Sequence, residues 1–213
     1  MDEFILINKP IGWTSHDVVG YLRKQFPKGT KVGHSGTLDP FASGLLIVGV
    51  GRGATKRLDE FKNLPKTYEA ILFLGATSDT QDKDGVITLT NIDKKYTREE
   101  IEKVLQKFIG PQLQTPPMYS AKKINGKKLY ELAREGIEVE RQPNKIEIYN
   151  IELLSYEYPH LKIRVNCSTG TYIRTLAHDI GQQLGCGAYC EELTRTQVGE
   201  HTLDNAQEIK KKD

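Results

Sequence analysis

Cysteine is scarce in this sequence of 213 residues, which contains only Cys167, Cys186 and Cys190. Three is an odd number and does not make the paired framework that holds small secreted domains together, so we expect free thiols in a reducing compartment. Cys186, Cys190 and the upstream His178 are residue types that bind zinc. No second pair of ligands stands nearby, so we expect no metal site.

Long apolar runs are missing as well. The amino terminus starts with acidic residues, and its apolar run covers only residues 4–7, with a lysine at position 9. A signal peptide has a basic start and a longer apolar core, and a membrane-spanning helix needs about 20 apolar residues. We therefore expect a cytoplasmic protein without a membrane segment.

Neither sign of charge dominates, because 30 basic residues stand against 28 acidic ones and give a formal net charge of +2. This balance does not by itself indicate a nucleic-acid partner, which has to be sought in local clusters. One such cluster lies between Tyr119 and Tyr130 and consists of Lys122, Lys123, Lys127 and Lys128. Lysines mixed with aromatic residues suit phosphates and unstacked bases, although a solvated helix face remains the alternative.

A nucleotide-binding loop is also not indicated. The glycine-rich stretch at residues 49–56 lacks the Gly-Lys-Ser/Thr ending of a phosphate-binding loop, and Ala54 replaces the third glycine of the dinucleotide pattern. We therefore expect no nucleotide cofactor.

Apolar periodicity and turn residues predict the secondary structure. Strands are expected over residues 4–8, 44–50, 68–74, 145–156 and 160–168, and helices over 54–62, 97–109 and 171–184. Thr14, with Asp17 three residues later, is typical of the first residues of another helix. Helices and strands do not alternate regularly, so we predict an α+β fold around a mixed or largely antiparallel sheet. No linker or repeat divides the chain, and we expect one domain over residues 1–213.

The stretch from Gly33 to Gly44, with the sequence GHSGTLDPFASG, is the most informative segment. Three glycines and a proline surround Asp39, which predicts a tightly specified loop that presents the carboxylate just before a strand. An Asp-Pro pair also starts many ordinary turns, and the pattern alone leaves that alternative open.

Two further positions stand out. Arg174 is expected in the first turn of a helix, where the positive end of the helix dipole disfavours a cation, so we expect an acidic partner, either a carboxylate or a phosphate. Tyr68 lies at the beginning of a strand, where an aromatic side chain either packs in the core or offers a binding surface.

Taken together, these stretches resemble one family, the TruB-type tRNA pseudouridine synthases. The resemblance is carried by NKPIGWTS from residue 8, GHSGTLDPFASGLLIVGVGRGATK from residue 33, KTYEA from residue 66, GATSDT from residue 75, PPMYSAKKINGKKLYELAREG from residue 116, STGTYIRTLAHDIG from residue 168 and ELTRT from residue 192. It covers nearly the whole chain in the family's order. It implies the pseudouridine synthase fold, a central sheet flanked by helices.

The resemblance also implies roles for single residues. Asp39 matches the family's catalytic aspartate, Tyr68 the tyrosine that stacks on the target base, and Arg174 the arginine that pairs with the aspartate. A partner that favours the charged carboxylate is needed because desolvation alone would raise the pKa of Asp39.

Further matches concern the binding of RNA. Tyr172 and Leu193 match positions that line the uridine pocket, and His34 matches a histidine that contacts the T-loop. Lys9 and Pro10 match a motif that packs beside the active-site loop, in a structural role.

The segment at residues 119–142 matches an inserted thumb that closes over RNA, with Lys122, Lys123, Lys127 and Lys128 as its candidate RNA contacts. Many members carry a further small RNA-binding domain of the PUA type at the carboxyl end, and we expect it to be absent here. RNA affinity would then depend on the catalytic domain and the thumb, and would fall steeply with salt.

The resemblance therefore predicts an enzyme that isomerises a uridine at position 55, in the T-loop of tRNA, to pseudouridine. The target base has to leave its stack. We expect no cofactor, no metal, tRNA as the partner, and a monomer. Two alternatives stay open: a subunit of the guide-RNA-dependent, dyskerin-like enzymes, and a catalytically idle module that binds or folds tRNA.

Overall fold

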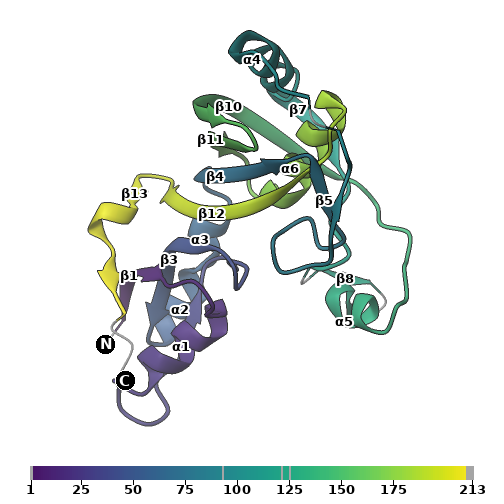
Figure 1. Cartoon of the computed structure of the whole chain (residues 1–213). Coiled ribbons are helices and arrows are strands. Elements are labelled where there is room, and N and C mark those ends of the chain that lie inside the picture. Colours follow the sequence, from purple (N-terminus) through teal and green to yellow (C-terminus); the bar gives the residue numbers. More distant parts are fainter. Residues whose placement is uncertain (1, 93, 121, 125, 210–213) are drawn as a thin grey trace. The chain divides into compact units, whose positions relative to one another are not determined.

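The computed structural model describes residues 2–92, 94–120, 122–124 and 126–209 (Figure 1). The chain forms two compact units: unit 1 joins residues 1–69 to residues 193–213, and unit 2 comprises residues 70–192. Strands β4 (Lys66–Leu74) and β12 (Ala188–Val198) contribute residues to both. Each unit is described by itself.

Unit 1 contains a mixed set of strands and three helices. Its elements are β1 (Glu3–Lys9), α1 (Ser15–Arg23), β2 (Val32–His34), β3 (Ser43–Val50), α2 (Arg52–Arg57), α3 (Asp59–Lys62), β13 (His201–Thr202), the 3-10 turn η1 (Leu203–Asn205) and β14 (Gln207–Glu208). The strands follow the order β14-β1-β3-β12, with β2 beside β3 and β13 beside β12. β1 runs antiparallel to β3, whereas β12 runs parallel to β3.

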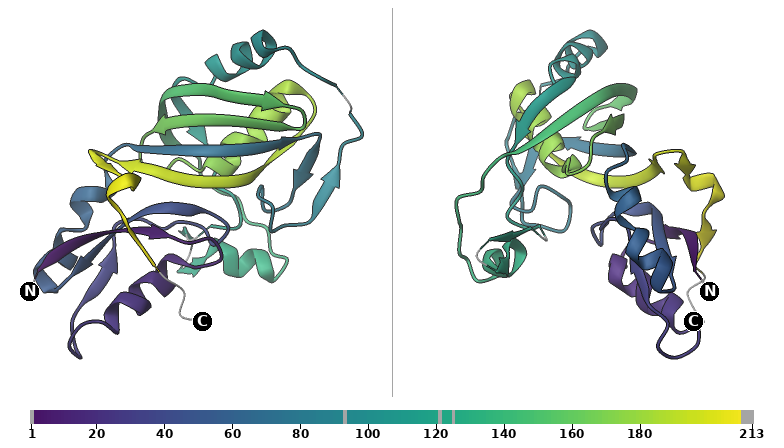
Figure 2. Two further views of the ribbon diagram at one scale, coloured as in Figure 1. Left: turned by 60° about the vertical axis from the view of Figure 1, so that its left-hand side comes forward. Right: turned by 180° about the vertical axis from the view of Figure 1, so that it is seen from behind.

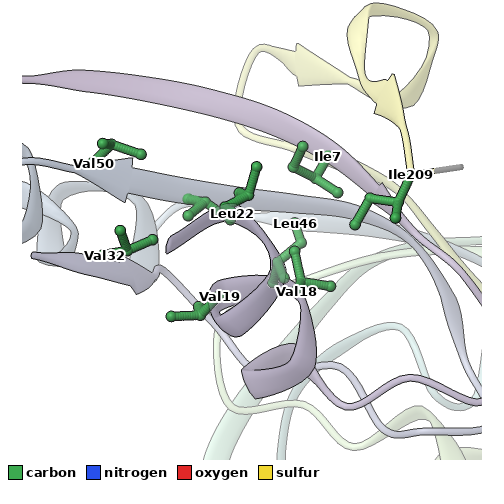
Figure 3. Close-up of a cluster of buried hydrophobic side chains, with 9 residues drawn as sticks. Ile7, Val18, Val19, Leu22, Val32, Leu46, Val50 and Ile209 are labelled. Carbon is green, nitrogen blue, oxygen red and sulfur yellow. The ribbon is translucent and has the colours of Figure 1, made fainter. Parts of the chain in front are cut away.

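Helix α1 covers the core of unit 1. Thr14 caps its first turn through a capping box with Asp17, as the sequence predicts. Val18, Val19 and Leu22 recur at helical spacing and point toward the strands, where they pack against Leu46 and other apolar side chains of β1 and β3 (Figure 3). The helix is therefore fixed at its beginning by the cap and along its length by the core.

Unit 2 is built around long antiparallel strands. Its elements are β5 (Ala76–Ser78), β6 (Ile87–Leu89), α4 (Arg98–Gln106), β7 (Gly110–Gln114), β8 (Lys123–Ile124), β9 (Lys127–Lys128), α5 (Leu129–Arg134), β10 (Asn144–Glu157), β11 (His160–Cys167) and α6 (Ile173–Leu184). The strands follow the order β12-β4-β11-β10-β7, and Figure 2 shows β10 and β11 side by side next to β4. Helix α4 contacts both α6 and β10.

Helix α6 buries the apolar positions that the sequence predicts to face inward: Ile173, Leu176, Ala177, Ile180 and Leu184. It begins two residues later than expected, because Tyr172 is extended (φ −95°, ψ 108°) and forms the N-cap. It ends at Gly185 in the left-handed region (φ 83°), a conformation that glycine adopts readily.

The predicted α+β class with a mixed sheet is confirmed. All five expected strands are present. They are β1, β3, β4, β10 and β11, and their ends differ from the expected ones by at most two residues. The single helix expected over residues 54–62 is instead two short helices, α2 and α3, separated by Leu58. Over the described residues, no helix combines the length and apolar character needed to cross a membrane.

Candidate active site

The loop that carries Asp39 connects β2 to β3 in unit 1 and is held from the start of α1. The hydroxyl of Ser15 accepts a hydrogen bond from the Leu38 amide (2.8 Å) and donates one to the Leu38 carbonyl (3.2 Å). The Gly12 amide donates to the Pro40 carbonyl at 2.8 Å. The residues on both sides of Asp39 are therefore fixed, and Asp39 itself is half-buried.

Two buried cations accompany this loop. Lys9 is fully buried and donates to the carbonyl oxygens of Pro10 (3.0 Å) and Trp13 (2.6 Å). Arg195 is 2% exposed and donates to the carbonyl oxygens of Leu45 (2.7 Å) and Gly36 (3.2 Å). Arg195 thus joins β12 to β3 and to the loop in front of Asp39.

The electrostatics of Lys9 reflect both burial and its charged neighbours. Burial lowers the pKa of Lys9 from 10.5 to about 8, the negative charge of Asp39 raises it, and the positive charge of Arg195 lowers it. The ammonium group and the carboxylate of Asp39 are therefore close enough to interact.

Adjacent strands bring two more predicted residues to unit 1. Ser43 of β3 shares a hydrogen bond with Thr194 of β12 (2.9 Å), which places the buried Leu193 next to the end of the Asp39 loop. The Thr196 hydroxyl donates to the carbonyl of Thr67 (3.3 Å), the residue before the half-buried Tyr68.

Gly44 is required where the loop enters β3. Its φ is +110°, and a Cβ atom there would stand 2.3 Å from the carbonyl oxygen of Arg195. No other residue fits without moving β12.

His34 ends β2 and is half-buried. Burial lowers its pKa, and the positive charges of Arg195, His16 and Lys62 lower it further, so the imidazole is neutral near pH 7. Its Nδ1 atom is buried and has no hydrogen-bond partner among the described residues. His34 is therefore able to form a further hydrogen bond.

Unit 2 carries Arg174, which lies in the first turn of α6 and is 2% exposed. Its guanidinium group forms an ion pair with Asp82 (3.2 Å) and donates to the carbonyl oxygens of Thr80 (2.8 Å) and Tyr119 (2.9 Å). Asp82 is a carboxylate partner of the kind that the helix position predicts. The pairing of Arg174 with Asp39 stays a prediction.

Tyr172 stands directly before α6 in unit 2. The side-chain amide of the buried Gln114 accepts a hydrogen bond from the Tyr172 amide (2.8 Å) and donates one to its carbonyl (3.0 Å). This pair of bonds fixes the backbone at the N-cap. The half-buried ring of Tyr172 takes no part in these two bonds.

The predicted RNA-binding lysines differ in their surroundings. The Lys122 ammonium group donates to the side chain of Asn144 (2.7 Å) and to the carbonyl of Gln142 (3.4 Å), whereas Lys127 is exposed. The side chains of Lys123 and Lys128 lie outside the described residues. Lys127 is therefore the accessible cation among the two whose side chains are described.

The structure groups the predicted site residues by unit: Asp39, His34, Tyr68 and Leu193 belong to unit 1, and Tyr172 and Arg174 to unit 2. Ser15, Asp82 and Arg195 support these residues and are not predicted from the sequence. Asp82 could have been found from the need of Arg174 for a carboxylate. The buried state of Arg195 has no local signal, because it depends on the pairing of β12 with β3. Across the described ranges, no group of three or more potential metal-binding side chains gathers.

Comparison with known proteins gives consistent matches along the chain. A family model described as "TruB family pseudouridylate synthase (N terminal domain)" matches residues 23–173. A second, described as "tRNA pseudouridylate synthase B C-terminal domain", matches residues 174–212.

Curated relatives cover almost the whole chain. The chain is 50% identical over 210 residues to tRNA pseudouridine synthase B of Syntrophomonas wolfei subsp. wolfei, with 97% of this chain and 70% of the relative covered. It is 50% identical over 206 residues to tRNA pseudouridine synthase B of Protochlamydia amoebophila, with 96% of this chain and 77% of the relative covered.

A similar solved structure is a chain from a crystal structure of a Cbf5-Nop10-Gar1 complex. It is 31% identical, with a TM-score of 0.74, and 97% of this chain and 52% of that chain are covered. The present chain therefore spans about half the length of that protein.

Proposed function

This chain belongs to the TruB family of pseudouridylate synthases, and from that premise we propose that it isomerises uridine 55, in the T-loop of tRNA, with Asp39 as the catalytic carboxylate. Its relatives are named tRNA pseudouridine synthase B, after the formation of pseudouridine in tRNA. The proposed role of Asp39 is supported by its position on a fixed loop beside the buried cation Lys9.

The isomerisation of uridine requires an ionised carboxylate. The bond between C1′ of the ribose and N1 of the base breaks, a bond between C1′ and C5 forms, and the proton of C5 is replaced by one on N1. No electrons are gained or lost and no external group is added. An aspartate can act on C1′ or on C6 of the base, and both actions need the charged form. Lys9, whose own pKa is raised by the negative charge of Asp39, is the buried cation next to this loop.

Binding of the target base requires its removal from the RNA stack, at a cost of a few kcal/mol. We propose that Tyr68 offsets part of this cost by stacking on the uridine, and that Tyr172 and Leu193 line the pocket. Arg174, oriented by Asp82, is proposed to pair with Asp39. His34 is proposed to contact the T-loop, as the resemblance to the family implies.

The alternatives receive less support. A subunit of a multi-protein assembly is less favoured, because the chain is 50% identical to tRNA pseudouridine synthase B of Syntrophomonas wolfei and 31% identical to the chain of the Cbf5-Nop10-Gar1 complex. Activity of the isolated protein on tRNA alone separates these two cases. An idle RNA-folding module is disfavoured, since it has no use for a carboxylate held beside a buried cation.

The test is to incubate the isolated protein with an unmodified tRNA transcript and to map pseudouridine at single-base resolution. We expect modification at position 55. Asp39→Asn is expected to slow the reaction roughly a thousand-fold or more while RNA affinity persists. Asp204→Asn, which makes the same change at an exposed site of unit 1, serves as the control and should match the unsubstituted protein. Unchanged turnover in Asp39→Asn would refute the assignment.

A further inference from the structure

A surface pocket with a volume of about 490 Å³ lies along α1 in unit 1. We call it the α1 pocket; its lining includes Trp13, His16, Asp17, Gly20, Tyr21 and Lys24. Pockets of roughly 300–1,000 Å³ are the usual size for small ligands, and this one would accept a single nucleotide.

The spacing of the helix explains the hollow. His16, Gly20 and Lys24 follow one another at intervals of four residues and so share one face of α1, while Val18 and Val19 point to the core (Figure 3). Gly20 has no side chain, and the position of a Cβ atom there would meet nothing within 4 Å. The face is therefore open in the middle, between an imidazole and an ammonium group.

Aromatic rings form one wall of the pocket. Trp13 and Tyr21 are half-buried, with ring centroids 5.9 Å apart and planes at 70° to each other. Both pack against the core cluster of unit 1, so their orientation is fixed by the fold. Rigid, partly exposed aromatic rings are the surfaces on which unstacked bases bind in proteins that recognise single-stranded RNA.

The polar groups of the pocket favour an anion beside the rings. Lys24 and His16 are exposed, and Lys24 is the lysine of the lining. Asp17 is the acidic member of the lining, but its carboxylate accepts hydrogen bonds from the Thr14 amide (2.8 Å) and the Thr14 hydroxyl (2.6 Å). These bonds hold the Asp17 carboxylate at the helix cap, and Lys24 is the basic group of the lining that can meet a phosphate.

The α1 pocket adjoins the candidate catalytic loop within unit 1. Ser15, next to His16 in the sequence, holds Leu38 and so the residue before Asp39. Gly12 also lines the pocket, and its amide donates to the carbonyl of Pro40, the residue after Asp39, at 2.8 Å. An RNA strand with its uridine at Asp39 therefore has a second place to bind a few residues away.

We propose that the α1 pocket binds a second unstacked nucleotide of the RNA substrate, with the base against Trp13 and Tyr21 and the phosphate on Lys24. This inference rests on the proposed function, because it assumes that the RNA reaches Asp39. The pocket contributes to RNA affinity and not to the reacting atoms. Its loss should raise KM and leave kcat unchanged.

The sequence offers a direct probe, because Trp13 is the only tryptophan of the chain. We expect its fluorescence to be quenched when a tRNA T-arm stem-loop is titrated into the intact protein. Tyr21→Leu and Lys24→Glu should each weaken RNA binding, by on the order of tenfold for the loss of a stacking surface. Tyr21→Phe keeps the ring and should bind normally, which separates stacking from a folding defect.

Lys28→Glu is the matched control, since it makes the same charge change at an exposed lysine outside the pocket lining. The proposal is overturned if RNA binds without quenching Trp13, or if Lys24→Glu and Lys28→Glu weaken binding equally. Formation of pseudouridine without quenching refutes the pocket and leaves the proposed function intact. Quenching that Tyr21→Leu and Lys24→Glu reduce, with no pseudouridine formed, supports the pocket and refutes the function.

Discussion

Buried cations stand out at the level of single residues: Lys9 and Arg195 beside the Asp39 loop in unit 1, and Arg174 in unit 2. Each donates hydrogen bonds to two main-chain carbonyl oxygens. Carbonyl oxygens carry only partial charges, so they orient a cation without neutralising it. Two of these charges also have an acidic neighbour: Asp82 forms an ion pair with Arg174 (3.2 Å), and the negative charge of Asp39 acts on Lys9.

Loss of the carboxylate of Asp82 should lower the free energy of unfolding. Asp82→Asn keeps the shape of the side chain but leaves the guanidinium group of Arg174 without this charge, and both side chains are at most 8% exposed. Breaking a buried pair on one side costs about 3–5 kcal/mol. We expect a loss of unfolding free energy in this range in denaturant titrations, together with slower pseudouridine formation. Asp84→Asn, at an exposed site two residues away, should change neither quantity.

The lowered pKa of Lys9 predicts a dependence of stability on pH. The pKa is about 8 in the folded state, against 10.5 for an ordinary lysine, so between these values the unfolded state binds the extra proton. Stability rises with pH wherever the unfolded state holds more protons. The unfolding free energy of the protein, measured relative to Lys9→Met, should therefore increase between pH 8 and 10, by at most about 1.4 kcal/mol per pH unit. A difference that stays constant over this range would contradict the assignment.

At the level of elements, α1 does more than cover the core. Its first residues hold the Asp39 loop through Ser15 and Gly12, and its outer face forms the α1 pocket. The cap at Thr14 could be predicted from the sequence, because a capping box depends on residues three apart. The contacts of Ser15 could not, because they join residues that are 23 positions apart in the sequence.

A comparison of two helix caps tests this double role. Thr14→Ala and Thr97→Ala each remove a capping box, at the start of α1 and of α4 respectively. Each should lower the unfolding free energy by about 1 kcal/mol. Only Thr14→Ala should also slow pseudouridine formation, because α1 holds the Asp39 loop through Ser15 and α4 belongs to unit 2. Equal turnover in the two variants at saturating RNA would show that the loop is held independently of the cap.

At the level of the whole molecule, the fold class and the main strands followed from apolar periodicity, while the arrangement of the site did not. Asp39 could be singled out because glycines and a proline surround it in the sequence. The burial of Arg195 depends on the parallel pairing of β12 with β3, between segments some 150 residues apart. Sequence periodicity carries no information on which strands pair at that distance.

RNA binding should depend on local charge, since the net charge of the chain is only +2. Lys127 is exposed, whereas Lys122 already donates to Asn144. Lys127→Gln should therefore weaken RNA binding and reduce the slope of log affinity against log salt by about one. Lys122→Gln should have a smaller effect on the slope. Affinities measured by filter binding between 50 and 300 mM salt would separate them, and identical slopes would argue against contact of Lys127 with phosphate.

The division of the chain determines the order in which the two units can be completed during synthesis. Unit 2 is one continuous stretch, residues 70–192, whereas unit 1 needs segments from both sides of it. Strand β14 pairs with β1 at Ile7 and Gln207, so a nascent chain meets this partner only after unit 2 has emerged. Domains generally fold as units during synthesis, so the Asp39 loop gains Arg195 as a neighbour only after all of unit 2 has been made.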